Sequence, residues 1–319
     1  MQLNAIQIRE ALPWDRLIEA LNDIFTKDVC APVRHHHSIN VPNDPEATLL
    51  LMPAWLEGEY LGVKMVNVFP GNNNRGFPGL NSNYMLSSGK TGQPLAQLDA
   101  NELTALRTAA ASAMASEYLS KENASELLMV GAGRMSRYLI PAHMSVRPIN
   151  KVRVWNRNEL AAAELVAELK ADGVDAEVCP LNQLEVAARN VDIVSCATMS
   201  TSPLIKGEWL KPGAHLDLVG SFTPVMRETD NTAMQRCSVF VDVRAGALSE
   251  TGDLIIPIRE GAITKDSIIA EFTQLCRGEH KGRQALNDPQ NAITLFKSVG
   301  DSREDLAAAV LAYQQSLPA

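Results

Sequence analysis

Hydrophobic and polar positions along residues 126–243 alternate between two kinds of segment. Short apolar runs of strand length are separated by longer stretches with the spacing of an amphipathic helix. The runs predict strands at 127–131, 151–155, 175–178, 191–196, 214–219 and 238–242. The stretches between them predict helices, among them 134–146, 158–172 and 181–189. This alternation is typical of an α/β fold, a doubly wound parallel sheet with helices on both faces.

The N-terminal part of the chain has a different pattern. Residues 6–26 predict a helix, and 34–98 contain several strand-like pieces divided by Gly, Pro and Asn clusters. The pieces at 85–88 and 94–98 flank Gly-Lys-Thr-Gly, which predicts a hairpin. We therefore expect an antiparallel α+β region in addition to the parallel sheet.

Two helices are expected to connect these regions. Residues 102–119 are dense in small side chains, which permit close packing, and they lead into the α/β region. Near the C-terminus, Ser302 is expected to cap a helix over 303–315, with Asp305 at its third position. We expect this helix to return to the N-terminal region. The predicted domains are therefore 1–119 with 301–319, and 120–300.

Glycines follow the first strand of the α/β region. Residues 127–136 read Leu-Leu-Met-Val-Gly-Ala-Gly-Arg-Met-Ser, an apolar run that ends in two glycines and a small serine. This layout lets a backbone approach a pyrophosphate and points a helix N-terminus at it. An ordinary turn is the alternative, but the spacing of the neighbouring elements favours dinucleotide binding. The candidate cofactor residues of this loop are Gly131, Gly133, Arg134 and Met135.

The next predicted strand bears on the choice of cofactor. It ends about 20 residues beyond the glycines, where dinucleotide-binding domains contact the ribose 2′ position. An acidic residue there would accept a hydrogen bond from the 2′-hydroxyl of NAD, but the residues present are Asn156 and Arg157. Since a cation attracts a 2′-phosphate, the pair predicts NADP(H) as the cofactor.

Further cofactor contacts are expected where later strands end. Thr198 and Ser200 follow one predicted strand, and Val219 and Ser221 stand at the end of the next. Ligands bind at this edge of α/β sheets, although an ordinary turn is again the alternative. The charged pair at 227–228 is interpreted as solvated.

Cations that could bind a substrate stand in the N-terminal region. Lys64 lies among apolar strand residues, where periodicity favours a strand edge and a buried active-site cation is the alternative. Arg107 lies in an alanine-rich helix, where an inward cation could bind a carboxylate bidentately. Arg34 precedes three histidines at 35–37, which alternate faces in a strand and cannot all bind one ion, so we expect no metal.

Composition limits the function classes. The chain has 319 residues, enough for two domains, and its net charge of −8 argues against binding to nucleic acid or to an anionic membrane. Because it lacks a signal peptide and an apolar stretch of about 18 residues, we expect a cytoplasmic protein without membrane association. Gly-x-Ser-x-Gly, His-Glu-x-x-His and P-loop motifs are absent, which disfavours a hydrolase or a kinase.

Several segments together form a pattern that covers nearly the whole chain. They are Arg34 in Pro-Val-Arg, Met52-Pro, Gly-Val-Lys-Met-Val-Asn-Val-Phe-Pro-Gly at 62–71, Glu-Leu-Thr-Ala-Leu-Arg-Thr-Ala-Ala-Ala-Ser at 102–112, the 131–136 loop, and Thr-Leu-Phe-Lys-Ser-Val-Gly at 294–300. On these segments the chain resembles the ornithine cyclodeaminase/mu-crystallin family. The resemblance implies a homodimer, with a dimerisation and substrate-binding domain and a Rossmann domain. It also implies that Arg34 and Arg107 bind the substrate carboxylate and that Lys64 is the active-site lysine.

Two departures from the family pattern bear on the reaction. Where cyclodeaminases have an Asp in the loop after the strand at 214–219, this chain has Phe222, followed by Thr223. Where they bind NAD through an acidic residue, it has Asn156 and Arg157. The Gly-Ser-Phe-Thr-Pro loop is similar to that of the reductase branch of the family.

The resemblance to that branch implies NADPH-dependent reduction of cyclic imino acids: Δ1-pyrroline-2-carboxylate to L-proline and Δ1-piperideine-2-carboxylate to L-pipecolate. Lys64 would hydrogen-bond the carboxylate or assist protonation of the imine, and Phe222 with Thr223 would contact the substrate. The alternatives are an enzyme like alanine dehydrogenase, an ornithine cyclodeaminase, and a non-catalytic protein that binds NADPH and small ligands like mu-crystallin.

Overall fold

The computed structural model describes residues 1–317, and the chain divides into two compact units. Unit 1 comprises Met1–Thr108 and Asp301–Ala319, and unit 2 comprises Ala109–Gly300. The last two residues of the range 301–319 lie outside the described residues. The boundary falls inside helix α3 (Ala100–Leu119), whereas the sequence analysis places it after 119. A continuous helix carries no loop signal at such a boundary.

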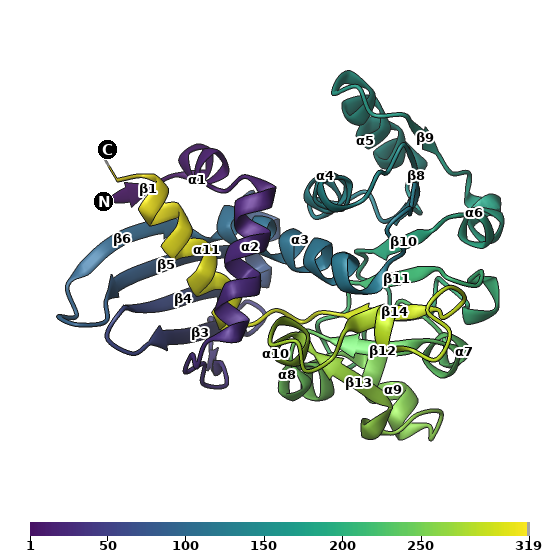
Figure 1. Ribbon diagram of the computed structural model, residues 1–319. Helices are drawn as coiled ribbons and strands as arrows, with labels where there is room; N and C mark the ends of the chain where they lie inside the picture. The colour runs from purple at the N-terminus through teal and green to yellow at the C-terminus, as the bar shows by residue number, and fades with distance from the viewer. Residues whose placement is uncertain (318–319) are drawn as a thin grey trace. The chain divides into compact units, whose positions relative to one another are not determined.

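Unit 1 is built on a six-stranded sheet in the order β1-β6-β5-β4-β3-β2 (Figure 1). Neighbouring strands are antiparallel except for β1 and β6. The strands are β1 (Gln2–Leu3), β2 (His35–Ile39), β3 (Ala47–Leu56), β4 (Tyr60–Val68), β5 (Leu80–Ser88) and β6 (Pro94–Asp99), with the 3-10 helix η1 (Pro70–Arg75) after β4. The predicted α+β region is therefore confirmed, and its hairpin is β5–β6.

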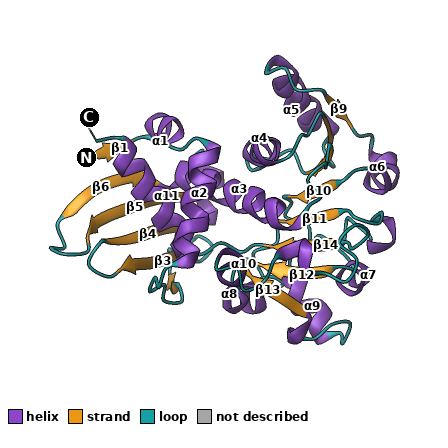
Figure 2. Cartoon of the chain, in the orientation of Figure 1, coloured by secondary structure: helices purple, strands orange, loops and turns teal. Residues whose placement is uncertain are grey.

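Three helices of unit 1 are α1 (Ala5–Ala11), α2 (Trp14–Thr26) and α11 (Ser302–Gln315), and α2 and α11 pack together over the sheet (Figure 2). The single helix predicted at 6–26 is wrong, because Pro13 divides it and proline disfavours helical backbone before it. Ser302 does not cap the C-terminal helix. Asp301 does so, by accepting a hydrogen bond from the Arg303 N–H.

Side chains of the six-stranded sheet alternate between a covered and an open face. Met52, Lys64, Tyr84 and Leu98 stand opposite one another across β3, β4, β5 and β6, and all four are buried. Their neighbours along each strand point to the other face, since successive strand residues alternate. The sheet register therefore brings Lys64 and Tyr84 side by side on the covered face.

Unit 2 contains an eight-stranded sheet in the order β13-β12-β14-β11-β10-β7-β8-β9, with all pairs parallel. Its strands are β7 (Glu126–Val130), β8 (Lys151–Trp155), β9 (Ala176–Val178), β10 (Ile193–Cys196), β11 (His215–Leu218), β12 (Ser238–Val241), β13 (Ile268–Glu271) and β14 (Thr294–Lys297). The order from β9 to β14 is that of a Rossmann fold, so the predicted fold class is confirmed. The sequence pattern did not predict β13 and β14.

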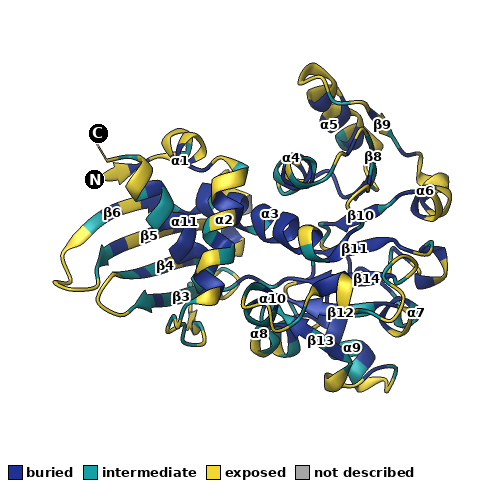
Figure 3. Ribbon diagram, in the orientation of Figure 1, coloured by how far each residue is buried: buried dark blue, intermediate teal, exposed yellow. Residues whose placement is uncertain are grey.

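The helices of unit 2 follow the expected alternation. They are α4 (Ser136–Val146), α5 (Glu159–Ala171), α6 (Leu184–Asn190), α7 (Asn231–Arg236), α8 (Arg244–Glu250), α9 (Gly252–Arg259) and α10 (Phe272–Cys276), with 3-10 helices η2 (Leu181–Gln183), η3 (Gly207–Trp209), η4 (Lys265–Ser267) and η5 (Gly282–Ala285). Helix α5 is exposed on one side, whereas β10, β11 and β14 are buried throughout (Figure 3). This contrast is typical of a sheet buried beneath amphipathic helices.

Candidate active site

The buried lysine of unit 1 pairs with the C-terminal helix. Lys64 Nζ lies 2.9 Å from Oδ1 and 2.7 Å from Oδ2 of Asp305 on α11, and both side chains are buried. It also donates to Thr104 Oγ1 at 3.4 Å. Because β4 is an interior strand and Lys64 points to its covered face, the strand-edge interpretation is wrong. Lys64 is buried and paired, as the alternative interpretation requires, and its role in an active site stays a prediction.

The arginine of α3 pairs with the same helix. Arg107 Nε donates to Asp305 Oδ1 at 2.9 Å, and Nη1 donates to Glu304 Oε2 at 2.7 Å. All three side chains are buried. Asp305 therefore accepts hydrogen bonds from both Arg107 and Lys64, and α11 joins β4 to α3 through charge-assisted contacts.

The charged groups of this cluster change one another's pKa values. The pKa of Lys64 is lowered to about 8, chiefly by burial and also by the charges of Arg107 and Arg34, while Asp305 opposes the shift. Burial would raise the pKa of Asp305, but the neighbouring Lys64 and Arg107 hold it below its usual value. The buried members of the cluster are two cations, Lys64 and Arg107, and two carboxylates, Glu304 and Asp305, and the charge of the partly buried Arg34 also acts on Lys64. A buried lysine and arginine are groups that can bind an anionic ligand.

A tyrosine lies next to the lysine. Tyr84 faces Lys64 across β4 and β5, and its buried hydroxyl has no hydrogen-bond partner within residues 1–317. Gly62 makes room for it, since a Cβ there would lie 1.8 Å from the Tyr84 hydroxyl oxygen. Burial and the charge of Asp305 raise the pKa of Tyr84 well above its usual value. The hydroxyl is therefore a neutral donor.

The glycine loop of unit 2 lies where the strand order reverses. It follows β7, whose neighbours are β8 and β10, and this switch point is where α/β sheets bind ligands. Gly131 has φ +115, and a Cβ there would lie 2.6 Å from the Ala197 carbonyl oxygen. A Cβ on Gly133 would meet no described atom within 4 Å. Ser136 Oγ donates to the Gly131 carbonyl at 2.8 Å, just as α4 begins. This loop, with Arg134 and Met135, fits a pyrophosphate beside a helix N-terminus.

The predicted 2′-position residues follow β8 directly. Arg157 Nη2 donates to Ser200 Oγ at 3.0 Å, so two predicted cofactor residues from separate loops meet. Asn156 Nδ2 donates to the Asn158 carbonyl at 3.0 Å. A guanidinium at this edge offers further donors to a phosphate.

The other predicted residues of unit 2 differ in their surroundings. Val219 continues the ladder past β11, and its N–H donates to the Cys196 carbonyl at 2.8 Å. Ser221 is buried, and its Oγ hydrogen-bonds the Met226 carbonyl and Thr251 Oγ1, each at 2.7 Å. The hydroxyl is therefore engaged in bonds within the protein. Phe222, by contrast, is 57% exposed.

The charged pair at 227–228 is not solvated, contrary to the sequence interpretation. Glu228 is fully buried, and Arg227 is 8% exposed. The Glu228 carboxylate accepts hydrogen bonds from Thr198 and Gly220. Its side chain therefore lies inside the loops at the edge of the sheet.

Comparison with known proteins gives the family. The model of the ornithine cyclodeaminase/mu-crystallin family matches residues 3–318. The chain belongs to this family. The resemblance stated from the sequence is therefore confirmed.

Relatives with named activities cover almost all of this family member. A Δ1-pyrroline-2-carboxylate reductase of Colwellia psychrerythraea is 36% identical over 312 residues, 96% of this chain and 96% of the relative. The structure of Thermococcus litoralis Δ1-pyrroline-2-carboxylate reductase in complex with NADH and L-proline is similar with a TM-score of 0.89 and 32% identity, covering 99% of this chain and 97% of that one. An archaeal alanine dehydrogenase dimer with bound NAD has a TM-score of 0.88 and 28% identity, covering 99% and 95%.

Three residues of the unit 1 cluster were missed by the sequence analysis. Asp305 is interpreted there only as an acidic residue in a first helical turn, and Glu304 and Tyr84 are not considered. A signal was present, because the adjacent acids stand in an otherwise alanine-rich helix directly after the family string at 294–300. An acidic pair on a helix that packs against a sheet indicates buried cationic partners.

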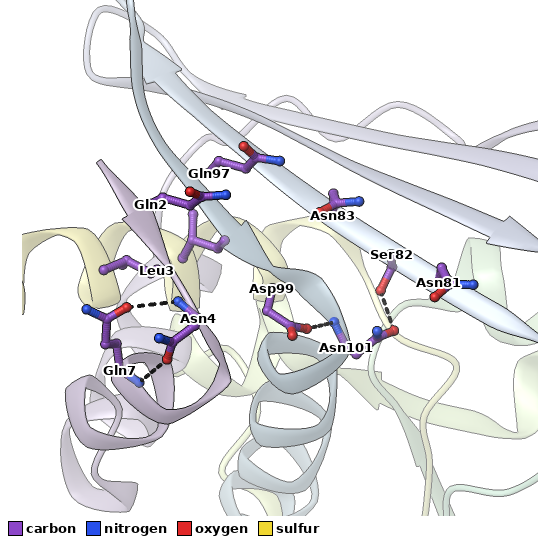
Figure 4. A pocket seen from close by; sticks show the side chains of 11 residues that line it. Gln2, Leu3, Asn4, Gln7, Asn81, Ser82, Asn83, Gln97, Asp99 and Asn101 are labelled. Carbon is purple, nitrogen blue, oxygen red and sulfur yellow. Dashed lines mark hydrogen bonds between the residues drawn. The ribbon is translucent and has the colours of Figure 1, made fainter. Parts of the chain in front are cut away.

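A hollow of about 440 Å³ at the edge of the unit 1 sheet is rich in amide side chains (Figure 4). Several of its polar groups serve the local fold. Asn4 and Gln7 form the capping box of α1, and Asp99 Oδ1 accepts from the N–H groups of Asn101 and Glu102 at the start of α3. These bonds account for part of the polarity of the hollow.

Neither a metal-binding cluster nor a membrane-spanning helix is found in the part of the chain that is described. No group of three or more His, Cys, Asp or Glu side chains there could hold a metal ion, and His35, His36 and His37 are all exposed. None of the helices within residues 1–317 has the length and apolar character needed to cross a membrane.

Proposed function

We propose that this protein uses a nicotinamide cofactor, preferably NADPH, to reduce cyclic imino acids: Δ1-pyrroline-2-carboxylate to L-proline and Δ1-piperideine-2-carboxylate to L-pipecolate. The observation that carries the proposal is the buried pair of cations Lys64 and Arg107, which Asp305 and Glu304 hold in place. A cyclic imino acid carries a carboxylate next to a basic C=N nitrogen, so its site needs a cation and a proton donor. Similarity to two Δ1-pyrroline-2-carboxylate reductases supports this substrate class.

Residues of unit 1 would bind and protonate the substrate. Arg34 and Arg107 would bind the carboxylate, which fixes the ring and its C2 atom. The pKa of Lys64, about 8, leaves most of its ammonium protonated at neutral pH while making the proton easier to transfer. A proton donated to the ring nitrogen gives an iminium carbon that accepts hydride without a covalent nucleophile. Asp305 would stabilise the charge of Lys64 until that transfer.

Residues of unit 2 would bind the cofactor, which supplies a hydride when bound. Gly131 and Gly133 allow backbone to approach a pyrophosphate, with Arg134 and Met135 completing the loop. Thr198, Ser200 and Val219 belong to the neighbouring loops at the same edge of the sheet. Arg157 supports the preference for NADPH because its guanidinium can pair with a 2′-phosphate.

The residues of the loop after β11 favour imine reduction over cyclodeamination. Phe222 and Thr223 would contact the substrate ring, and Phe222 stands where cyclodeaminases have an Asp. Oxidation of ornithine and release of ammonia require proton transfers at two amines, and general acid–base groups are typically worth about 10²–10⁴-fold. Reduction of a preformed ring imine needs no such carboxylate.

The protein is further proposed to be a homodimer formed through the open face of the unit 1 sheet. Met65 and Met85 are 39% and 41% exposed on that face, and Leu51, Pro53 and Val63 stand in register with them. An exposed apolar sheet face of this kind marks an interaction site. The dimeric structure of the related alanine dehydrogenase supports a second copy as the partner.

Steady-state oxidation of NADPH and NADH tests the proposal. The purified protein is assayed with Δ1-pyrroline-2-carboxylate, Δ1-piperideine-2-carboxylate, pyruvate plus ammonia, and no substrate. We expect the highest kcat/KM with a cyclic imine and NADPH. Lys64→Met should abolish turnover, whereas Lys151→Met, at a partly exposed ion pair in unit 2, should leave it unchanged.

The alternatives give different results in the same assays. Turnover only with pyruvate and ammonia would indicate an enzyme like alanine dehydrogenase. Proline and ammonia formed from ornithine at a comparable rate would indicate a cyclodeaminase. Tight NADPH binding without turnover of any substrate would indicate a non-catalytic binding protein.

A further inference from the structure

We infer that Glu228 is a positioning residue for the cofactor, because its carboxylate holds together the loops that follow β10 and β11. This inference rests on the proposed function, in which that edge of the sheet binds the nicotinamide cofactor. Oε1 of Glu228 accepts hydrogen bonds from the N–H and Oγ1 of Thr198 at 2.7 and 2.8 Å. Oε2 accepts from the Gly220 N–H at 2.8 Å. One buried side chain thus satisfies donors from both loops.

The tied loops lie in close contact with the glycine loop. A Cβ on Gly131 would lie 2.6 Å from the Ala197 carbonyl oxygen, and a Cβ on Gly220 would lie 2.1 Å from the Thr198 carbonyl oxygen. The loops after β7, β10 and β11 therefore pack backbone against backbone. A shift in the loop after β11 toward the loop after β10 would bring the two backbones into collision, so the positions of these loops are coupled.

The backbone of Glu228 is itself held by hydrogen bonds on both sides. Its N–H donates to Asp253 Oδ1 at 2.8 Å, and its carbonyl accepts from the N–H groups of Leu204 and Ile205 at 2.8 and 3.1 Å. The carboxylate is therefore held in place from α9 and from the segment after β10. A side chain anchored in this way can determine where Thr198 and Gly220 lie.

The ionised carboxylate is the form that accepts all three hydrogen bonds. Burial and the nearby Asp253 raise the pKa of Glu228 to about 7, whereas Lys297 and the bonds from Thr198 lower it. The titratable groups that face it are Asp253 on α9, Lys297 on β14 and Cys196 on β10. Protonation turns one acceptor oxygen into a donor, so cofactor affinity is expected to fall as the pH drops through about 7.

Fluorescence titration with NADH across this pH range tests the inference. NADH is used because the 2′-phosphate of NADPH also titrates, with a pKa of about 6. For the wild type we expect NADH affinity to decrease below about pH 7. In Glu228→Gln an amide NH₂ faces a donor at every pH, so we expect binding at least about tenfold weaker at high pH and no titration.

Asp230→Ala is the matched control. Asp230 lies in the same loop, but it accepts hydrogen bonds from Gly207 and Ala233, so its loss should lower Tm and leave NADH affinity unchanged. If the wild type binds neither NADH nor NADPH, the proposed function is overturned. If it binds NADH with a flat pH profile, or if Glu228→Gln retains wild-type affinity and pH dependence, only the role of Glu228 is overturned. The wild-type profile decides the matter even if the variant does not fold.

Discussion

Lys64 Nζ lies 2.7 Å from Asp305 Oδ2, although the two residues are 241 positions apart in the chain. Both side chains are removed from water, where an unpaired charge is costly and a paired one is retained. The contact joins the centre of the sheet to α11 and opposes the effect of burial on the pKa of Lys64. The same ion pair thus contributes to the fold of unit 1 and to the proton chemistry proposed for it.

Asp305→Asn is expected to impair proton transfer more than binding. Asp305 raises the pKa of Lys64, so its neutralisation should move that pKa below about 8. The alkaline limb of the kcat/KM profile should shift to lower pH, because Lys64 would lose its proton earlier. Loss of one partner of a buried pair costs about 3–5 kcal/mol, so a lower free energy of unfolding is also expected.

Glu304→Gln provides the comparison for that variant. Glu304 pairs with Arg107 and leaves the Lys64–Asp305 contact in place. The Glu304→Gln variant should have a lower free energy of unfolding, but the alkaline limb of its kcat/KM profile should not shift. Equal pH profiles for the wild type and Asp305→Asn would show that Asp305 does not control the proton on Lys64.

Arg157→Asp is expected to reverse the cofactor preference. The guanidinium beside Ser200 would lose its pairing with the 2′-phosphate, and the new carboxylate would repel it. We expect the ratio of kcat/KM for NADPH to that for NADH to fall by at least about tenfold, since each 1.4 kcal/mol is a factor of ten. Arg16→Asp, which removes an exposed ion pair with Glu19 in unit 1, should leave the ratio unchanged. Equal use of both cofactors by the wild type would contradict the assignment.

Arg34→Ala and Arg107→Ala are expected to abolish use of the cyclic imino acid while NADPH affinity is retained. The charges of both arginines lower the pKa of Lys64, and both residues belong to unit 1 and not to the cofactor loops of unit 2. Arg107→Ala should also destabilise unit 1, because Glu304 and Asp305 lose a buried partner. NADPH titration by fluorescence beside substrate kinetics separates the effects. Weaker NADPH binding with an unchanged substrate KM would show that these arginines do not belong to the substrate site.

The double variant Met65→Glu/Met85→Glu is expected to be monomeric. Both methionines lie on the open face of the unit 1 sheet, where two carboxylates would have to be buried in a dimer. Light scattering after size-exclusion chromatography should show the mass of a dimer for the wild type and of a monomer for the variant. Leu160→Glu, at an exposed position of α5, is the control and should remain dimeric. A monomeric wild type would exclude this interface.

Much of the Rossmann architecture followed from local patterns. Strand-length apolar runs, helical periodicity and the turn chemistry of Gly131 are encoded within a few neighbouring residues, so the sequence alone predicted β7 to β12 and the loop after β7. The four-residue strands β13 and β14 were missed, although β10, β11 and β12 are equally short and were predicted. Pro13 was another local signal, and the single-helix prediction overlooked it.

Tertiary structure alone decided which charges are buried and what they contact. The periodicity around Lys64 could not distinguish an edge strand from an interior one, since strand order is a property of the whole sheet. Glu228 reads as a surface residue, yet it is buried because the loops after β10 and β11 supply three donors for its carboxylate. Arg107 meets Glu304 across 197 positions. Such pairings depend on how distant elements pack, and a local pattern of residues cannot contain that information.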